Sequence, residues 1–294
     1  MNELLPGETR MGRVSLDVGD LDALTSFYRD VLLLDVLAER PGEVDLGRGA
    51  GTLVTLRHRP GLQRGERRSA GLFHTAILHP DRAALAATLA SVAVQTPQLY
   101  TGAGDHLVSQ AFYLDDPEGN GIELYWDRPR SEWRWQDGRV VMDTLAIDPN
   151  GFIGDHLTDT ARDHLSTAAD RRGALAGLDG TVGHVHLKVG DANLAKRFYV
   201  DLLGFELTSE FPGAVFVSAG GYHHHMAMNT WRSAGAGMRA PALGLGRVDI
   251  VLPDASDVAM AADRLRAAGS QLRDSGEAVE LDDPWGNLVR LSPV

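Results

Sequence analysis

Cysteine is absent from this chain of 294 residues. Without it there is no disulfide, no thiolate metal ligand and no cysteine nucleophile, so any bound metal must be held by His, Asp or Glu. No apolar run is long enough to cross a membrane, and the opening residues, MNELLPGETRMGR, lack the apolar core of a signal peptide. We therefore expect a cytoplasmic protein that has no membrane partner.

Basic residues are also scarce. Lys and Arg number 28 against 40 Asp and Glu, which gives a formal net charge of −12. This excess of negative charge argues against nucleic acid as the main partner. Hydrophobic residues make up 44% of the chain and charged residues 23%, which is an ordinary balance for a soluble globular protein of one large or two smaller domains.

The chain repeats one pattern four times. Residues 14–36, VSLDVGDLDALTSFYRDVLLLDV, match residues 185–207, VHLKVGDANLAKRFYVDLLGFEL. In both, an alternating strand leads through a Gly-Asp turn into a segment with helical periodicity. A second match joins residues 73–92 to residues 247–269, and each of these is followed by an Asp-Pro-x-Gly-Asn turn between two strand-like runs.

These repeats predict four βαβββ modules, at residues 12–58, 71–126, 183–231 and 243–292. The fold class is α+β, with two pseudo-symmetric barrels of curved sheet. The first two modules belong to an N-terminal part (1–130) and the last two to a C-terminal part (182–294), joined by a connector with a short helix (131–181). One module leaves a sheet face uncovered, so two should pack to enclose a cavity lined by their first and last strands.

One position of the first strand differs between the modules in a regular way. It is occupied in turn by Arg13, His74, His184 and Arg247. On the last strands, Glu123 of the second module corresponds to Arg290 of the fourth. Arginine stays protonated and cannot bind a metal. We therefore predict that modules two and three share a cavity that holds a metal, and that modules one and four share a metal-free counterpart.

The resulting candidate ligands are His74, His184 and Glu123. Two histidines and one carboxylate are the ligand set of non-haem Fe(II) oxygenases, which leaves positions open for substrate and O₂. A single strand histidine is more often structural, and a single strand glutamate is more often exposed. The joint pattern across the repeats favours a metal site over either of these interpretations.

The segments GHVHLKVGD, HLVSQAFYLDDPEGNGIELYWDRPR and SAGGYHHH resemble the vicinal oxygen chelate superfamily, and most closely its bacterial catechol-2,3-dioxygenases, the type I extradiol ring-cleaving enzymes. The resemblance implies that Fe(II), with Mn(II) as the alternative, is held by His74, His184 and Glu123. It also implies that the partners are a small aromatic diol and O₂, and it leaves a homo-oligomer open. In many extradiol enzymes the ligands come from the third and fourth modules, whereas here modules two and three carry them.

The same resemblance implies further catalytic residues. Tyr113, ten residues before Glu123, would hydrogen-bond a substrate oxygen, and His106 lies near the place of another family histidine. His225 would be the acid–base group on the last strand of the third module, with His224 as the next choice, because ring cleavage requires proton transfer and a neutral imidazole can provide it.

Three consecutive histidines occur in the segment AGGYHHHMAMNTW (219–231). On a strand, alternation would turn His223 and His225 to one face and His224 to the other. We therefore expect His225, with His223, to face the cavity, and His224 to be structural.

Two other functions remain open on the sequence. Glyoxalase-like lyases and isomerases share this scaffold but typically place a carboxylate on two last strands, where the third module here offers histidines. Bleomycin-resistance-type proteins bind small molecules without metal chemistry and are usually chains of two modules.

Overall fold

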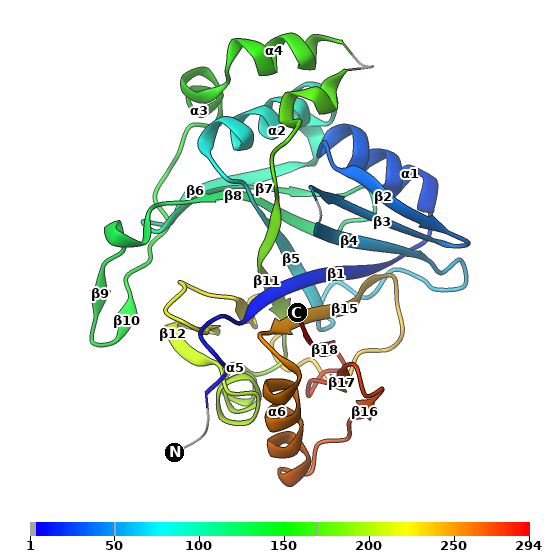
Figure 1. Cartoon of the computed structure of the whole chain (residues 1–294), viewed down its shortest axis with the longest axis vertical. Coiled ribbons are helices and arrows are strands. Elements are labelled where there is room, and N and C mark those ends of the chain that lie inside the picture. The colour runs from blue at the N-terminus through cyan, green and yellow to red at the C-terminus, as the bar shows by residue number, and fades with distance from the viewer. Residues whose placement is uncertain (1–3, 50, 168–169) are drawn as a thin grey trace.

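The computed structural model describes residues 4–49, 51–167 and 170–294 (Figure 1). Residues 1–3 and 50 of the predicted N-terminal part, and residues 168–169 of the predicted connector, lie outside the described residues. The described strands form two eight-stranded sheets and one small hairpin, which confirms an α+β fold built from two curved sheets. In the described part of the chain, no helix combines the length and apolar character needed to cross a membrane.

One sheet joins the first and fourth modules in the order β16-β17-β18-β15-β1-β4-β3-β2. Its strands are β1 (Arg10–Val18), β2 (Asp35–Arg40), β3 (Glu43–Arg48), β4 (Gly51–His58), β15 (Gly244–Leu252), β16 (Arg273–Asp274), β17 (Val279–Asp282) and β18 (Leu288–Pro293). The two first strands, β1 and β15, pair antiparallel at the centre, and each pairs in parallel with the last strand of its own module.

The other sheet joins the second and third modules in the order β12-β13-β14-β11-β5-β8-β7-β6. Its strands are β5 (Gly71–Leu78), β6 (Tyr100–Asp105), β7 (Ser109–Asp115), β8 (Gly121–Asp127), β11 (Thr181–Lys188), β12 (Glu206–Phe211), β13 (Ala214–Ser218) and β14 (Met226–Asn229). The central pair is again antiparallel, β5 with β11. The modules are thus paired as the Arg-His-His-Arg series predicts.

Each module carries its helix between its first and second strands. The helices are α1 (Leu21–Ser26) continued by η1 (Phe27–Val31), α2 (Arg82–Gln95), α5 (Ala192–Lys196) continued by η5 (Arg197–Leu202), and α6 (Ala255–Ala267). All four begin with an aspartate whose carboxylate accepts a backbone N–H of the first turn, namely Asp20, Asp81, Asp191 and Asp254. These caps satisfy helix N–H groups that have no partner within the helix.

The two most recognisable repeat motifs meet across module boundaries. The hydroxyl of Tyr28, from the Phe-Tyr pair that the matching segments 14–36 and 185–207 share, donates to Asp116 of the Asp-Pro turn of module two over 3.3 Å. Tyr199 of module three donates to Asp283 of module four over 3.1 Å. Burial raises the pKa of Asp116 to about 6. The sheets therefore join modules two with three and one with four, while these buried bonds join one with two and three with four.

The connector runs outside both sheets. It contains the hairpin β9 (Trp135–Gln136) and β10 (Arg139–Val140), the helices α3 (Pro149–His156) and α4 (Asp159–Ser166), and the 3₁₀ turn η4 (Arg171–Leu175). The helices α3 and α4 pack on α2, where they gather at the top of Figure 1. A further short turn, η3 (Arg130–Glu132), follows β8, and η2 (Pro97–Leu99) follows α2.

The sheet of modules one and four carries an ion-pair network where its counterpart carries histidines. Arg13, Arg247 and Arg290 lie 3.5, 2.6 and 3.7 Å from the carboxylate of Asp249, which is 5% exposed. Asp249 stands two residues after Arg247, so its side chain shares the same face of the strand. The three arginines at the positions that correspond to the candidate ligands thus gather around one buried carboxylate.

Removal of that carboxylate's charge should destabilise the fold. We expect Asp249→Asn to lower the free energy of unfolding by about 3 kcal/mol, the lower end of the range for breaking a buried ion pair, because the three arginines remain partly desolvated. Asp282→Asn is the matched control, since its bond to Arg273 is exposed and should be worth below about 1 kcal/mol. Urea denaturation followed by circular dichroism measures both, and equal losses would contradict the central role of Asp249.

A second prediction concerns acid stability. Burial, helped by Arg48, lowers the pKa of His79 to about 3 from 6.5. The unfolded chain therefore binds this proton first, so the contribution of His79 is complete above pH 6.5 and is lost as the pH falls toward 3, at about 1.4 kcal/mol per pH unit. His79→Gln should flatten the loss of stability between pH 7 and 5, as measured by urea denaturation. Replacement of the exposed His58 by Gln is the control, and an unchanged slope in His79→Gln would contradict the assignment.

Candidate metal centre

Pairing at the centre of the sheet brings three side chains of modules two and three together. On β5 and β11, His74 lies opposite His186, and His184 lies opposite Ala76. On the other side of β5, Ala76 lies opposite Glu123 of β8. The small side chain of Ala76 therefore lies between His184 and Glu123, with His74 two residues earlier on the same face.

Donor atoms of His74, Glu123 and His184 all lie within 4.8 Å of one another. Oε2 of Glu123 lies 3.0 Å from Nε2 of His74 and 3.2 Å from Nε2 of His184. All three side chains are buried, and Nε2 of His74 has no hydrogen-bond partner of acceptable geometry among the described residues. Two imidazole nitrogens and one carboxylate oxygen converging on one point form a site that fits a divalent metal ion.

Two glycines allow the ligand-bearing strands to approach their neighbours. A Cβ on Gly183, next to His184, would lie 1.6 Å from the hydroxyl oxygen of Tyr125. A Cβ on Gly121, two residues before Glu123, would lie 2.0 Å from the carbonyl oxygen of Phe73, next to His74. Both distances are far below contact distance, so a side chain at either position would push a ligand strand away.

The site stabilises the charge of its carboxylate. Burial by itself would raise the pKa of Glu123, but the imidazoles of His184 and His74 hold it well below its usual range. Burial lowers the pKa of His184, against the opposing influence of Glu123. The carboxylate is therefore ionised and the His184 imidazole neutral near pH 7, which are the states in which each group binds a metal.

Tyr113 and His106 lie together at one side of the site. Nδ1 of His106 lies 2.9 Å from the carbonyl oxygen of Asp143, and its Nε2 lies 2.6 Å from the hydroxyl of Tyr113. Because a carbonyl can only accept, Nδ1 donates and the Tyr113 hydroxyl donates to Nε2. Burial, followed by the charge of Glu123, raises the pKa of Tyr113 well above 10. Both residues line the cavity, beside the donor triad.

The histidine run differs from its prediction. Strand β14 begins only at Met226, after a turn in which Gly220 and Gly221 have φ values of 61° and 65°. Strand alternation therefore does not apply to residues 223–225, and the prediction that His225 faces the cavity is wrong.

His225 instead fixes the turn. Its Nδ1 accepts the backbone N–H of Ala219 over 3.2 Å and lies 2.9 Å from the hydroxyl of Ser218. Burial lowers its pKa to about 3, so it is neutral in the folded protein.

Within the run, the histidine that lines the cavity is His224, the second choice for the acid–base group, which strand alternation predicted to be structural. Its ring lies 4.1 Å from that of the ligand candidate His184. Burial holds its pKa well below the usual value. A histidine of the third module thus lines the cavity, one residue before the predicted position.

A further cavity residue, His186, was missed. Its ring lies 4.9 Å from that of His74, and its Nε2 lies 2.9 Å from the amide nitrogen of Asn229. Aromatic rings of Phe73, Phe216 and Trp231 surround it at 4.9 to 5.8 Å. The signal was available in the sequence, because the spacing in His184-Val-His186 puts both imidazoles on one strand face.

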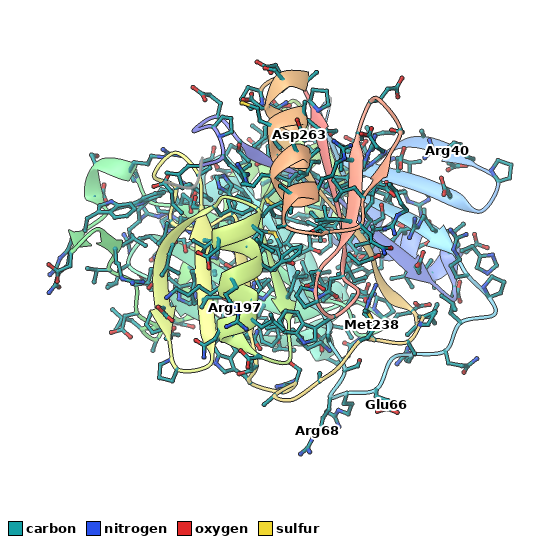
Figure 2. The ribbon with its side chains drawn as sticks, turned by 90° about the horizontal axis from the view of Figure 1, so that it is seen from below. Arg40, Glu66, Arg68, Arg197, Met238 and Asp263 are labelled. Carbon is teal, nitrogen blue, oxygen red and sulfur yellow. The ribbon has the colours of Figure 1, made fainter. Side chains whose placement is uncertain are left out.

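The cavity has a volume of about 2090 Å³ and extends from the donor triad to two loops between modules. These loops, residues 59–70 and 230–243, are joined by a bond from the Leu243 N–H to the Gln63 carbonyl. Figure 2 shows them side by side at the rim, one carrying Glu66 and Arg68 and the other carrying Met238. The loops that connect module one to module two and module three to module four therefore line the cavity together.

Comparison with known proteins agrees with this architecture. The Glyoxalase/Bleomycin resistance protein/Dioxygenase superfamily model matches residues 10–124 and 181–291. The chain belongs to this superfamily. It is 38% identical over 287 residues to the "Catechol-2,3-dioxygenase" of Bacillus subtilis (strain 168), with 94% of each chain covered.

Solved structures show the same fold. A candidate dioxygenase from Bacillus subtilis subsp. subtilis str. 168 superimposes with a TM-score of 0.64 at 14% identity, over 100% of this chain and 86% of that one. Glyoxalase I from Zea mays superimposes with a TM-score of 0.57 at 16% identity, over 97% and 92%. At these identities the likeness concerns the fold alone.

The donor triad generates a direct prediction. Glu123→Gln keeps the shape of the side chain and removes its charge, so metal affinity should fall by more than about 100-fold. Loss of a residue that only hydrogen-bonds to a metal ligand typically lowers metal affinity by at most about 100-fold. Glu66→Gln, at the exposed rim of the same cavity, is the control and should bind metal like the wild type. Metal content after anaerobic loading and desalting measures the effect. Stoichiometric metal in Glu123→Gln would show that Glu123 is not a ligand.

Proposed function

We propose that the protein is a non-haem Fe(II)-dependent extradiol dioxygenase that opens the ring of a catechol-like aromatic diol with O₂. The observation that carries the proposal is the buried set of two imidazoles and one carboxylate, all within 4.8 Å, at the wall of a large cavity. A ligand set of this kind occupies one face of Fe(II) and leaves open positions for exogenous ligands. The 38% identity to a protein named catechol-2,3-dioxygenase supports the same chemistry.

We assign Fe(II) to His74, His184 and Glu123, with Mn(II) as the alternative metal. When bound there, the metal would act as a Lewis acid toward the diol and would supply the redox chemistry of its reaction with O₂. The overall reaction adds both atoms of O₂ to the diol and breaks a ring carbon–carbon bond next to the diol. The substrate supplies all of the electrons, so no further reductant is required.

The surrounding residues have separate roles. The Tyr113 hydroxyl, held by His106, lies beside the triad and orients a substrate oxygen. His224, on the opposite module, takes the acid–base role that the sequence predicted for His225, because it lines the cavity while His225 is bonded into the turn. The ring of the diol packs against Phe73, Phe216 and Trp231, which line the same cavity.

The proposal is tested by anaerobic loading with Fe(II), followed by O₂ uptake with a panel of catechols and hydroquinones. We expect one O₂ consumed per diol and a product whose mass is that of the diol plus O₂, with both atoms labelled by ¹⁸O₂. Loading with Mn(II) in parallel decides between the two metals. Bound metal without O₂ consumption for any diol would contradict the proposal and favour a lyase or isomerase, and a metal-free protein that binds aromatic compounds would favour a binding protein.

Tyr113 provides a more specific prediction. Tyr113→Phe keeps the ring and removes the hydroxyl, whose oxygen is free to accept a hydrogen bond from a substrate hydroxyl, so kcat should fall by about 10²-fold, as for loss of one positioned hydrogen-bonding group, while metal content stays that of the wild type. Tyr100→Phe is the matched control, because the ring of Tyr100 does not line the cavity. Steady-state O₂ consumption and metal analysis on the same preparation measure the effect. Wild-type kcat in Tyr113→Phe would exclude Tyr113 from the reaction.

A further inference from the structure

A chain of hydrogen bonds leads from Asp127 to the cavity. Oδ1 of Asp127, at the end of β8, lies 2.8 Å from Nε2 of His223, and Nδ1 of His223 lies 2.8 Å from Nδ1 of His224. The other carboxylate oxygen of Asp127 accepts from the hydroxyl of Tyr222 over 2.7 Å. Asp127 and the two histidines are 96 and 97 residues apart in sequence, so the fold alone brings them together.

The chemistry of these groups decides which of them donates and which accepts in each hydrogen bond between Asp127 and His224. The ionised carboxylate of Asp127 only accepts hydrogen bonds, so Nε2 of His223 carries a proton and donates it. His223 has no exposed surface and lies among the rings of Tyr222, Trp133 and Tyr125, at 4.1, 5.1 and 6.3 Å. With one proton on the ring, at Nε2, Nδ1 of His223 is an acceptor, and Nδ1 of His224 must donate to it.

We propose that Asp127 and His223 are positioning residues that hold His224 in the tautomer protonated on Nδ1, so that its Nε2 presents a lone pair to the cavity. No hydrogen bond to Nε2 of His224 is made from the described residues. His224 is therefore ready to accept a proton from a substrate hydroxyl bound next to His184. This role in substrate deprotonation rests on the proposed function, whereas the tautomer itself does not.

A doubly protonated His223 would reverse the direction of the hydrogen bond between His223 and His224. If His223 carried two protons, its Nδ1 would donate, Nδ1 of His224 would accept, and Nε2 of His224 would present a proton to the cavity. His224 would then be a hydrogen-bond donor toward the substrate. The two arrangements differ in which nitrogen of His224 is protonated, and that can be measured directly.

The first test is nitrogen NMR of the full-length protein labelled with ¹⁵N-histidine and loaded with diamagnetic Zn(II). Proton-bearing and bare ring nitrogens have well-separated shifts, so long-range ¹H–¹⁵N correlations identify each tautomer. We expect His224 protonated on Nδ1 and His223 protonated on Nε2. A His224 ring protonated on Nε2, or a doubly protonated His223, would overturn the proposal whether or not the protein cleaves diols.

The second test compares substitutions of His223. His223→Leu removes the acceptor, so the His224 signals should show a mixture of tautomers, and kcat should fall by about 10–100-fold with little change in KM or metal content. His223→Asn can place an amide oxygen near the former Nδ1 position and should restore most of the activity. Asp127→Asn can either donate or accept toward His223, so it should also give mixed tautomers.

His58→Leu, on the exposed end of β4, is the control and should change none of these quantities. A purely structural role would lower the thermal stability of His223→Leu without mixed tautomers and with no difference between Leu and Asn in kcat. That outcome would overturn the proposal. If the wild type cleaved no diol, the proposed function would fail, while the nitrogen shifts would still decide the tautomer.

Discussion

The candidate metal centre depends on the antiparallel pairing of β5 with β11. His74 and His184 are 110 positions apart in the chain, and only this pairing brings their rings to 5.6 Å. Because side chains alternate along a strand, a slip of one residue would turn His74 or His184 out of the cavity. The close approaches at Gly121 and Gly183 fix the strands that carry the other donors. Ligand geometry, cavity shape and module pairing therefore all follow from one register.

Both sheets bury polar side chains beside their central strand pair, but the two sets of side chains attract partners of opposite charge. Around the β5–β11 pair, imidazoles and a carboxylate converge where a cation fits. Around the β1–β15 pair, three arginines converge on Asp249. In both cases polar groups deep in the sheet require a partner of opposite charge, since an unpaired buried charge is costly. The protein itself supplies that partner in the sheet of modules one and four, and a bound cation is the proposed partner in the sheet of modules two and three.

The repeats made the fold and the ligand set accessible from the sequence, because equivalent positions could be compared between modules. The orientation of the three consecutive histidines could not be predicted in this way. Alternation is valid only within a strand, and the turn at Gly220 and Gly221 delays β14 until Met226. The link between Asp127 and His223 has no periodic signature at all, since it joins the end of one module to a turn of another.

The order of the modules along the chain has a consequence for synthesis. Modules two and three, which hold the site, are nested between modules one and four, and β1 has its antiparallel partner only in β15. As the chain leaves the ribosome, the inner pair can close once β14 has emerged, while the first module still has an unpaired edge. Such edges template pairing with other chains. During synthesis, the half that carries the candidate site can therefore be complete while β1 still lacks its antiparallel partner.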